Sequence, residues 1–502
     1  MPDPIDGGFL TSVPQASEYP VRITQWKGRA SLPAATPSLS DRLNVWSLLK
    51  NSPTQAGKDL SQIAMPVIVN EPISLLQRVL SQANPVRQMA EDLEYCSLLS
   101  QAALASDPLD RLLLVAAFAV SSYASSQTRA TRKPFNPLLG ETYELTRPDL
   151  GFRFVAEKVS HHPTIIAGHA NGDRFTYAQE NCVKSKFWGK SVELRPHGLV
   201  HVVLKTTGEH FVWSKVTTRI SGMLERTISH VGDMTVRCIH PCPSTETGAA
   251  PEYPSISATA PGNVLKDGSS AAGLSVTLSF KDSGYFSASP CTRVTTTDIS
   301  FTPDASTSSE NDPGNGSKRP NSAVLYSSSS SKPHSPIVKT LEGTWTHELA
   351  IGENVVWRYN KPLLDEDSAF GFGAFAVSLN ELCYDILPLL PRTDSRLRGD
   401  QRLYECGHID EADEEKMRLE QKQRDAIKKS NQQQQQQHGK DHDGHMRPRW
   451  FIRKPVVDPQ LKGQTVAGKL HGRDTEWTFT NEYWHAKKKG FEKVPGIRDL
   501  FS

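Results

Sequence analysis

Glu157-Lys158-Val159-Ser160-His161-His162-Pro163-Thr164 places two adjacent histidines and a proline inside a pattern of β-strands. Apolar or aromatic residues alternate with polar or small ones over residues 151–156, and the strand pattern resumes at 164–169. Pro163 has no N–H to donate to a sheet, so it marks a strand end, an edge or a bulge. Both imidazoles are therefore expected at the rim of a sheet. There they can donate to an anionic oxygen, hold a metal ion or act as a general base, or they can be an ordinary satisfied pair at a strand end.

A second stretch, residues 132–144, contains a stiff loop. Pro134 and Pro137 flank Asn136, and the residue before each proline is pushed out of the helical region of backbone space. The amide of Asn136 and the ammonium of Lys133 are expected to project from this loop.

A third stretch, residues 414–424, has the composition of a charged helix. Lys416, Glu420 and Arg424 stand four residues apart, so they share one face of that helix. An ordinary surface helix with paired charges has the same pattern, and the spacing alone does not assign a site.

Together the three stretches resemble the ligand-binding domain of the oxysterol-binding protein-related family. Six of the eight residues of its signature Glu-Gln-Val-Ser-His-His-Pro-Pro are present, with Lys158 in place of Gln and Thr164 in place of the last Pro. The family block Lys-Pro-x-Asn-Pro-x-Leu-Gly-Glu is complete at residues 133–141, and Lys-x-x-x-Glu-x-x-x-Arg is complete on the charged helix. The resemblance runs from about residue 43 to the C-terminus, with two insertions.

The resemblance implies a mainly β fold with flanking helices. It is an incomplete antiparallel β-barrel that encloses a hydrophobic lipid tunnel, with an N-terminal helical lid and a C-terminal helical and aromatic subdomain. In the family, the matching residues hold the headgroup of phosphatidylinositol 4-phosphate at the tunnel mouth. The residues implied for that headgroup site are Lys133, Asn136, His161, His162, Lys416, Glu420 and Arg424.

The resemblance also implies roles within this site and a second ligand. Glu420 would orient Lys416 and Arg424 or accept a hydrogen bond from an inositol hydroxyl. Lys158 would add positive charge if it faces the same side, and Thr164 would loosen the turn after the histidines. The tunnel would carry a sterol, or phosphatidylserine as in some family members, and the two lipids would be exchanged between membranes.

The N-terminal part of the chain divides into two regions. Residues 1–38 are rich in proline, serine and glycine and are expected to be disordered. Residues 39–130 are expected to form an amphipathic lid followed by helices at about 73–82, 85–97 and 107–125. The lid helix occupies the place of the family's lid, and its apolar face carries Leu43, Trp46 and Leu49. An ordinary helix docked on a core is the alternative for this segment.

The rest of the chain is expected to form the barrel and its cover. Residues 131–400 are assigned to the barrel, with low-complexity insertions at 241–272 and 303–335. Residues 401–502 are assigned to the charged helix, a glutamine-rich linker and an aromatic segment that covers the barrel. The alternation of apolar residues predicts strands at 141–146, 151–159, 164–170, 174–181, 187–195, 198–206, 210–217, 233–238, 337–341, 343–350 and 354–359.

Composition sets the compartment and excludes several partners. The formal net charge of +2 gives no overall attraction to nucleic acid. The seven cysteines are scattered and odd in number, which favours a reducing compartment over a disulfide framework. The most apolar run, residues 112–120, is too short to span a bilayer. We therefore expect a cytoplasmic, monomeric protein that contacts membranes peripherally, at endoplasmic reticulum contact sites, the Golgi or the plasma membrane.

Two other classes of function are alternatives to lipid transfer. A metal-dependent hydrolase built on His161 and His162 would need a third ligand and a base, yet the chain has neither a His-Glu-x-x-His nor a Gly-x-Ser-x-Gly motif. Cys238 and Cys242 lack a second ligand pair, so no metal site is expected there. Since the motifs of an enzyme are also missing, we expect neither an enzyme nor a cofactor. A lipid sensor or scaffold that uses the same pocket is not separated from a transfer protein by the sequence.

Overall fold

The computed structural model describes residues 28–37, 66–77, 89–129, 132–161, 163–187, 191–221, 227–239, 272–281, 292–301, 339–362, 370–436, 448–456 and 475–502. Four residues of the predicted site and lid lie outside these ranges, namely Leu43, Trp46, Leu49 and His162. The two predicted insertions lie almost entirely outside them.

One large sheet dominates the described residues. Twelve of its fourteen strands run in the order β16-β15-β14-β13-β12-β11-β10-β7-β6-β5-β4-β3. The other two, β8 and β9, form a hairpin that bridges β6 to β11 beside β7 and β10. All of these pairings are antiparallel. The strands are β3 (Thr142–Arg147), β4 (Phe152–Ser160), β5 (Ile165–Gly172), β6 (Phe175–Phe187), β7 (Ser191–His197), β8 (Val200–Leu204), β9 (His210–Trp213), β10 (Thr217–Ser221), β11 (Thr227–Ile239), β12 (Leu274–Phe280), β13 (Arg293–Phe301), β14 (Leu341–Thr344), β15 (Glu348–Ile351) and β16 (Asn354–Arg358).

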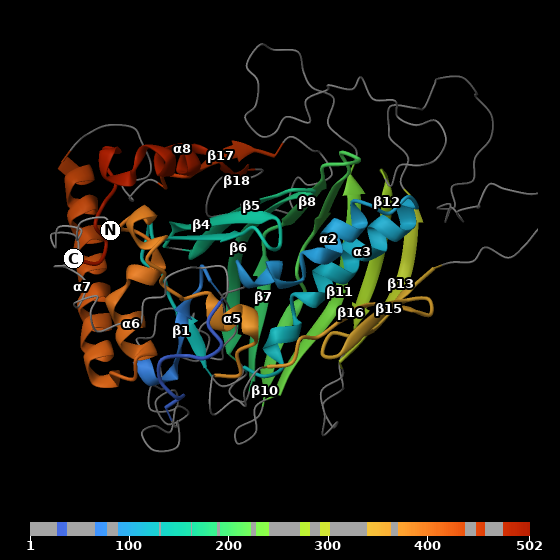
Figure 1. Ribbon diagram of the computed structural model, residues 1–502, viewed down its shortest axis with the longest axis horizontal. Helices are drawn as coiled ribbons and strands as arrows, with labels where there is room; N and C mark the ends of the chain where they lie inside the picture. The colour runs from blue at the N-terminus through green and yellow to red at the C-terminus, as the bar shows by residue number, and fades with distance from the viewer. Residues whose placement is uncertain are drawn as a thin grey trace, which may run out of the picture.

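The sheet is an incomplete barrel. It curves around α2 (Ser97–Ala102) and α3 (Pro108–Ser121), which lie along its concave side (Figure 1). In the described part of the chain β3 and β16 stand at opposite ends of the strand order and do not pair with each other. The fold class predicted from the sequence is thus confirmed.

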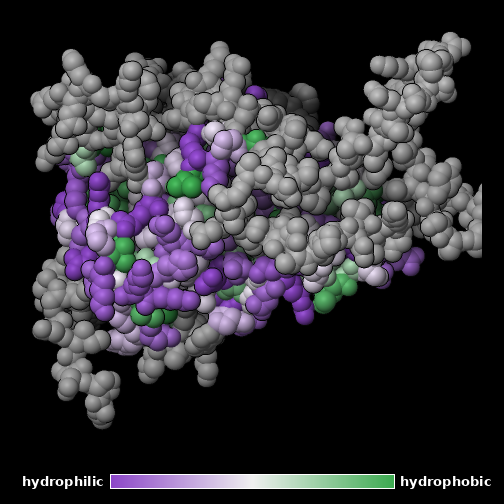
Figure 2. Space-filling model, turned by 90° about the horizontal axis from the view of Figure 1, so that it is seen from above, coloured by the Kyte–Doolittle hydropathy of each residue, from purple (hydrophilic) through white to green (hydrophobic). Residues whose placement is uncertain are grey.

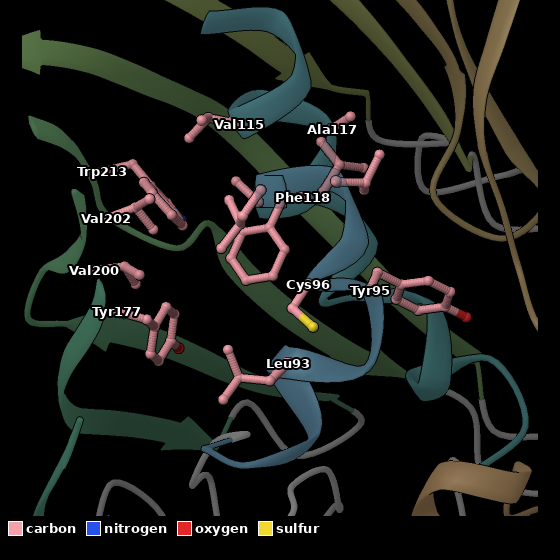
Figure 3. Packing of buried hydrophobic residues seen from close by; sticks show 14 of the residues in the cluster. Leu93, Tyr95, Cys96, Val115, Ala117, Phe118, Tyr177, Val200, Val202 and Trp213 are labelled. Atoms are coloured by element: carbon pink, nitrogen blue, oxygen red, sulfur yellow. The ribbon is translucent and has the colours of Figure 1, made fainter. Parts of the chain in front are cut away.

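Helix α3 supplies the centre of the core. Asp107 caps its first turn by accepting a hydrogen bond from the Leu109 N–H at 2.9 Å, and a proline occupies the first helical position. Phe118 packs edge-on against Tyr177 and Trp213, with ring centroids 6.1 and 6.3 Å away (Figure 3). The helix expected at about 107–125 is therefore confirmed over residues 108–121, and it is buried on almost every side.

Alternate side chains of β4 point to opposite faces of the sheet and pack in two different hydrophobic cores. Phe154 and Ala156 point to the inner core with α3, whereas Val155 and Val159 belong to a second core on the outer face. That outer core is completed by β17 (Phe451–Pro455), β18 (Thr475–Phe479), α8 (Glu482–Lys489) and the short helix η11 (Phe491–Lys493). These elements face solvent with a mostly hydrophilic surface (Figure 2).

Some of the remaining helical elements lie beside β1 (Asn70–Ser74), which pairs with β2 (Lys133–Phe135), at the end of the molecule opposite β13 (Figure 1). The long helix among them is α7 (Ile409–Gln436), and α6 (Gly399–Glu405) packs against it. The shorter elements are η5 (Val67–Val69), η6 (Glu91–Tyr95), η7 (Ala124–Ser126), α5 (Ala374–Ser378), η9 (Leu387–Leu389) and η10 (Ser395–Leu397).

Several local predictions were wrong. The helix expected at 73–82 is replaced, as far as it is described, by the end of β1 and a turn, because β1 finds a parallel partner in β2 far along the chain. The glutamine run expected as a linker continues α7 as far as Gln436. The strand expected at 210–217 is two strands, β9 and β10, and strands β12 and β13, close to the low-complexity insertions, were missed.

Residues 28–37, expected to be disordered, instead contact α5, α6 and the segment just before α5. The Arg29 side chain donates to the carbonyl oxygen of Val377 at 2.7 Å and pairs with the carboxylate of Glu405. Thr36 Oγ1 accepts a hydrogen bond from the N–H of Phe370 at 2.8 Å. These partners are distant in the sequence, so composition gave no sign of them.

Candidate functional site

The structure brings the described parts of the three sequence stretches together. Lys133 begins β2, Asn136 follows it in the loop, and His161 lies in the turn after β4. Lys158, on β4, joins the first two stretches, since its ammonium donates to Asn136 Oδ1 at 3.1 Å and lies 3.2 Å from His161 Nδ1. Gln423 joins α7 to the loop by accepting a hydrogen bond from the Leu139 N–H at 2.8 Å.

The loop is held by buried polar contacts beneath it. Glu141 accepts a hydrogen bond from the Leu138 N–H at 2.8 Å, and the Arg398 guanidinium donates to the same carboxylate at 3.0 Å. Arg398 also donates to the carbonyl oxygen of Asn136 at 2.8 Å. Gly140 adopts a φ of +81°, which a residue without a Cβ accepts at no steric cost. Asn136 is therefore presented from a fixed backbone.

Helix α7 turns its charged face to this loop. Lys416 Nζ lies 3.5 Å from a carboxylate oxygen of Glu420, and Arg424 lies 3.8 Å from the other. Leu419 is fully buried in an apolar cluster that also contains Leu138, which sets the rotation of the helix. The predicted stripe is present, with Lys416 buried and Arg424 exposed.

The site is rich in buried positive charge. Burial, and next the neighbouring ammonium of Lys416, lower the pKa of Lys133 to about 7, against the opposing effect of Glu420. Within the described residues, no hydrogen-bond acceptor is in reach of the Lys133 ammonium. Burial likewise lowers the pKa of Lys158 to about 7. Such a cluster favours a ligand that brings several negative oxygens.

Comparison with known proteins agrees with this architecture. The model of the family described as "Oxysterol-binding protein" matches residues 44–488. The chain belongs to the oxysterol-binding protein family. It is 37% identical over 406 residues to human oxysterol-binding protein-related protein 7, covering 80% of this chain and 39% of that protein. It is 33% identical over 492 residues to oxysterol-binding protein-related protein 2B of Arabidopsis thaliana, covering 96% of this chain and 55% of the relative. The chain therefore spans roughly two fifths to one half of the length of these relatives.

Solved structures of the oxysterol-binding protein family have the same fold. The Osh3 ORD of Saccharomyces cerevisiae, in complex with PI(4)P, superimposes with a TM-score of 0.65 at 28% identity, covering 95% of this chain and all of that one. The Osh1 ORD domain in complex with cholesterol gives a TM-score of 0.67 at 28% identity, covering 95% of this chain and 94% of that one.

For this oxysterol-binding protein family member, six of the seven predicted site residues can be placed. Lys133, Asn136 and His161 are connected through Lys158 and the loop, while Lys416, Glu420 and Arg424 line α7. His162 lies outside the described residues. The hydroxyl of Thr164 donates to the carbonyl oxygen of His161 at 3.3 Å, and the expectation that Thr164 loosens the turn stays a prediction.

Sequence reasoning missed the supports of the site. Arg398 and Gln423 carry no motif, and their partners lie hundreds of residues away, so spacing gave no signal for them. Glu157, the first residue of the histidine stretch, is not part of the site. Its carboxylate accepts hydrogen bonds from the N–H groups of Arg449 and Trp450 at 2.8 and 2.9 Å and holds the C-terminal cover to β4.

Two further findings concern the described residues only. They contain no group of three or more His, Cys, Asp or Glu side chains arranged to bind a metal ion. None of their helices combines the length and the hydrophobicity that a membrane crossing requires.

Proposed function

We propose that this chain is a lipid-transfer module that extracts phosphatidylinositol 4-phosphate and a sterol from membranes and exchanges them between two membranes. Lys133, His161, His162, Lys416 and Arg424 donate to the headgroup phosphates, together with the amide of Asn136. Glu420 keeps Lys416 and Arg424 in place. The module acts by binding and has no catalytic step.

The observation that carries this proposal is the buried ammonium of Lys133 beside the ammonium of Lys416. A phosphate monoester carries a charge of about −1.5 to −2 near neutral pH and presents three strong acceptor oxygens. It would supply the acceptors that Lys133 lacks in the described residues and offset the repulsion between the neighbouring cations. The PI(4)P complex of the similar Osh3 domain supports this choice of headgroup.

The sterol is the second part of the proposal. Burying about 25 carbons at about 0.8 kcal/mol each gives roughly 20 kcal/mol relative to water. A bilayer offers a similar gain, so extraction is close to balance and the cargo can be released again. The complexes of the similar Osh1 domain with cholesterol and ergosterol support a sterol. Phosphatidylserine is the alternative second cargo.

The proposal extends to the segments outside the described residues and to location. The helix that contains Leu43, Trp46 and Leu49 acts as the lid, and the low-complexity insertions 241–272 and 303–335 interrupt the barrel. The monomeric protein works in the cytoplasm, peripherally attached at endoplasmic reticulum contact sites, the Golgi or the plasma membrane.

Transfer between liposomes tests the proposal. Wild type should move labelled phosphatidylinositol 4-phosphate and a labelled sterol, whereas His161→Ala/His162→Ala and Lys133→Met should lose phosphoinositide transfer and largely keep sterol transfer. Arg358→Met is the control, because this arginine is exposed on β16, far from β4 in the strand order.

Three outcomes have clear meanings. No extraction of phosphatidylinositol 4-phosphate by the wild type would overturn the headgroup assignment. Extraction without transfer to acceptor liposomes would favour a lipid sensor or scaffold. Transfer of phosphatidylserine in place of sterol would change the second cargo and leave the headgroup site as proposed.

A further inference from the structure

Lys158 is completely buried and its ammonium is surrounded by acceptors. It donates to the carbonyl oxygen of Pro137 at 2.7 Å and to Asn136 Oδ1 at 3.1 Å, and it lies 3.2 Å from His161 Nδ1. An ammonium has three protons and no lone pair, so these three contacts use all of its hydrogen-bonding capacity. Lys158 therefore has no proton left for a ligand and must act through its neighbours.

We propose that Lys158 is a positioning residue of the headgroup site, which sets both Asn136 and His161 as hydrogen-bond donors and makes headgroup binding take up a proton. This inference rests on the proposed function and deepens it. It concerns a residue at which this chain departs from the signature it otherwise resembles, since glutamine stands there in that signature.

The positioning follows because an ammonium group donates hydrogen bonds and cannot accept them. In its charged form, which predominates below about pH 7 and in the phosphate complex, Lys158 only donates, so the amide oxygen of Asn136 faces it and the NH₂ group of that amide is turned away. Because His161 Nδ1 accepts, the ring proton of the neutral imidazole lies on Nε2. Both groups then offer N–H donors, which suit phosphate oxygens. A glutamine has only two N–H donors for the three acceptors and can reverse its amide, so it does not impose this arrangement.

The proton uptake follows from the charges around two buried lysines. Besides burial, Lys158 feels the carboxylates of Glu141 and Glu420, which favour its charged form, and Arg398, which opposes it. Arg398 is itself paired with Asp400. For Lys133 the corresponding neighbours are Lys416 and Glu420. With a pKa of about 7 in the empty site, both lysines are largely neutral at about pH 8, and an incoming phosphate dianion draws a proton onto each.

The sign of the pH dependence is therefore defined. Binding takes up close to two protons at about pH 8, so affinity falls as pH rises above about 7, by up to about tenfold per pH unit for each lysine. Below about pH 6 the phosphate itself gains a proton, which weakens binding from the other side.

The experiment uses the full chain and phosphatidylcholine vesicles that carry phosphatidylinositol 4-phosphate. Proton uptake is measured at about pH 8 by calorimetry in two buffers of different ionisation enthalpy, and affinity is followed from about pH 6.5 to about pH 8.5. Lys158→Gln should take up about one proton instead of about two. At about pH 6.5 it should also bind the vesicles more weakly than wild type does. Lys158→Arg, whose guanidinium stays charged, should also take up about one proton but keep most of the affinity. Arg358→Met should behave as wild type.

A second readout does not depend on binding. The ¹⁵N shifts of the histidine rings in the empty protein report which nitrogen of His161 carries the proton, with His161→Gln used to assign its signals. At about pH 6.5, where Lys158 is mostly charged, wild type should show Nε2–H, and Lys158→Gln should show a mixture of both forms. The same proton uptake and the same ring form in wild type and Lys158→Gln would overturn the inference. Failure of the wild type to bind these vesicles would overturn the proposed function instead, with the ring form still testing Lys158.

Discussion

Replacing Arg398 with methionine tests how the loop at residues 136–141 is held in place. Arg398 makes two hydrogen bonds to Asp400, at 2.7 and 2.8 Å, and its side chain is only 1% exposed. It also donates to Glu141 at 3.0 Å and to the carbonyl oxygen of Asn136 at 2.8 Å. Methionine fills a similar length without charge, so the variant leaves two buried carboxylates facing an apolar side chain.

The expected loss of stability is about 3–5 kcal/mol, the usual cost of removing one partner of a buried ion pair. Burial already raises the pKa of Glu141, and Arg398 is the strongest of the groups that hold it down. Without Arg398 this pKa rises further. A carboxyl whose folded pKa exceeds its unfolded value favours folding while it is protonated, and that contribution is lost as pH rises through the folded pKa. The deficit of Arg398→Met should therefore be larger at about pH 8 than at about pH 5.

Urea unfolding at both pH values measures this deficit, with Arg358→Met as a control expected to stay within about 0.5 kcal/mol of wild type. Adding Glu141→Gln to Arg398→Met removes one of the unpaired buried carboxylates and should recover part of the lost stability. Glu141→Gln alone completes the double-mutant cycle. A deficit below about 1 kcal/mol, or one independent of pH, would refute the claim that Arg398 neutralises buried carboxylates beneath the loop.

Three other predictions concern residues elsewhere in the sheet and its cover. Burial raises the pKa of Glu180 to about 7, so the wild type loses stability as pH rises from about 4.5 to about 7. Glu180→Gln should therefore gain up to about 3 kcal/mol over wild type across this range in urea unfolding. A difference that does not change with pH would contradict this. Tyr483→Phe removes the hydroxyl that donates to Glu144 at 2.8 Å and should cost about 1.5–3 kcal/mol by the same measurement, unless the carboxylate finds another donor. Gly343 has a φ of +146°, and an added Cβ would overlap the carbonyl oxygen of Glu348. Gly343→Ala should therefore lower the free energy of unfolding by at least about 1 kcal/mol and speed amide exchange in β14. Amide exchange in β14 at the wild-type rate would refute the overlap.

Much of the barrel could be predicted because its signals are local. The alternation along β4 and β5 serves cores on both faces of the sheet, and the apolar run of α3 marks a helix buried on every side. The spacing of Lys416 and Arg424 is likewise a property of one helix and survives folding unchanged. Where structure depends on partners within a few residues, the sequence is sufficient.

The elements that were missed depend on distant partners. β1 exists because β2 pairs with it, and residues 28–37 are ordered because Arg29 meets Glu405 on α6. Arg398 contacts the loop across 262 positions of sequence. No propensity or period within a short window contains such information, since the backbone and the side chain alone are compatible with several environments.

The two departures from the histidine signature show how a substitution in a site can be judged once its surroundings are known. Thr164 replaces a proline, and its hydroxyl donates to the carbonyl oxygen of His161. Lys158 replaces an amide that could donate two protons with an ammonium that donates three, and three acceptors surround it. Each change is matched by the number of donors and acceptors around it. The departures therefore alter how the site is held and protonated, and the headgroup chemistry that we propose is retained.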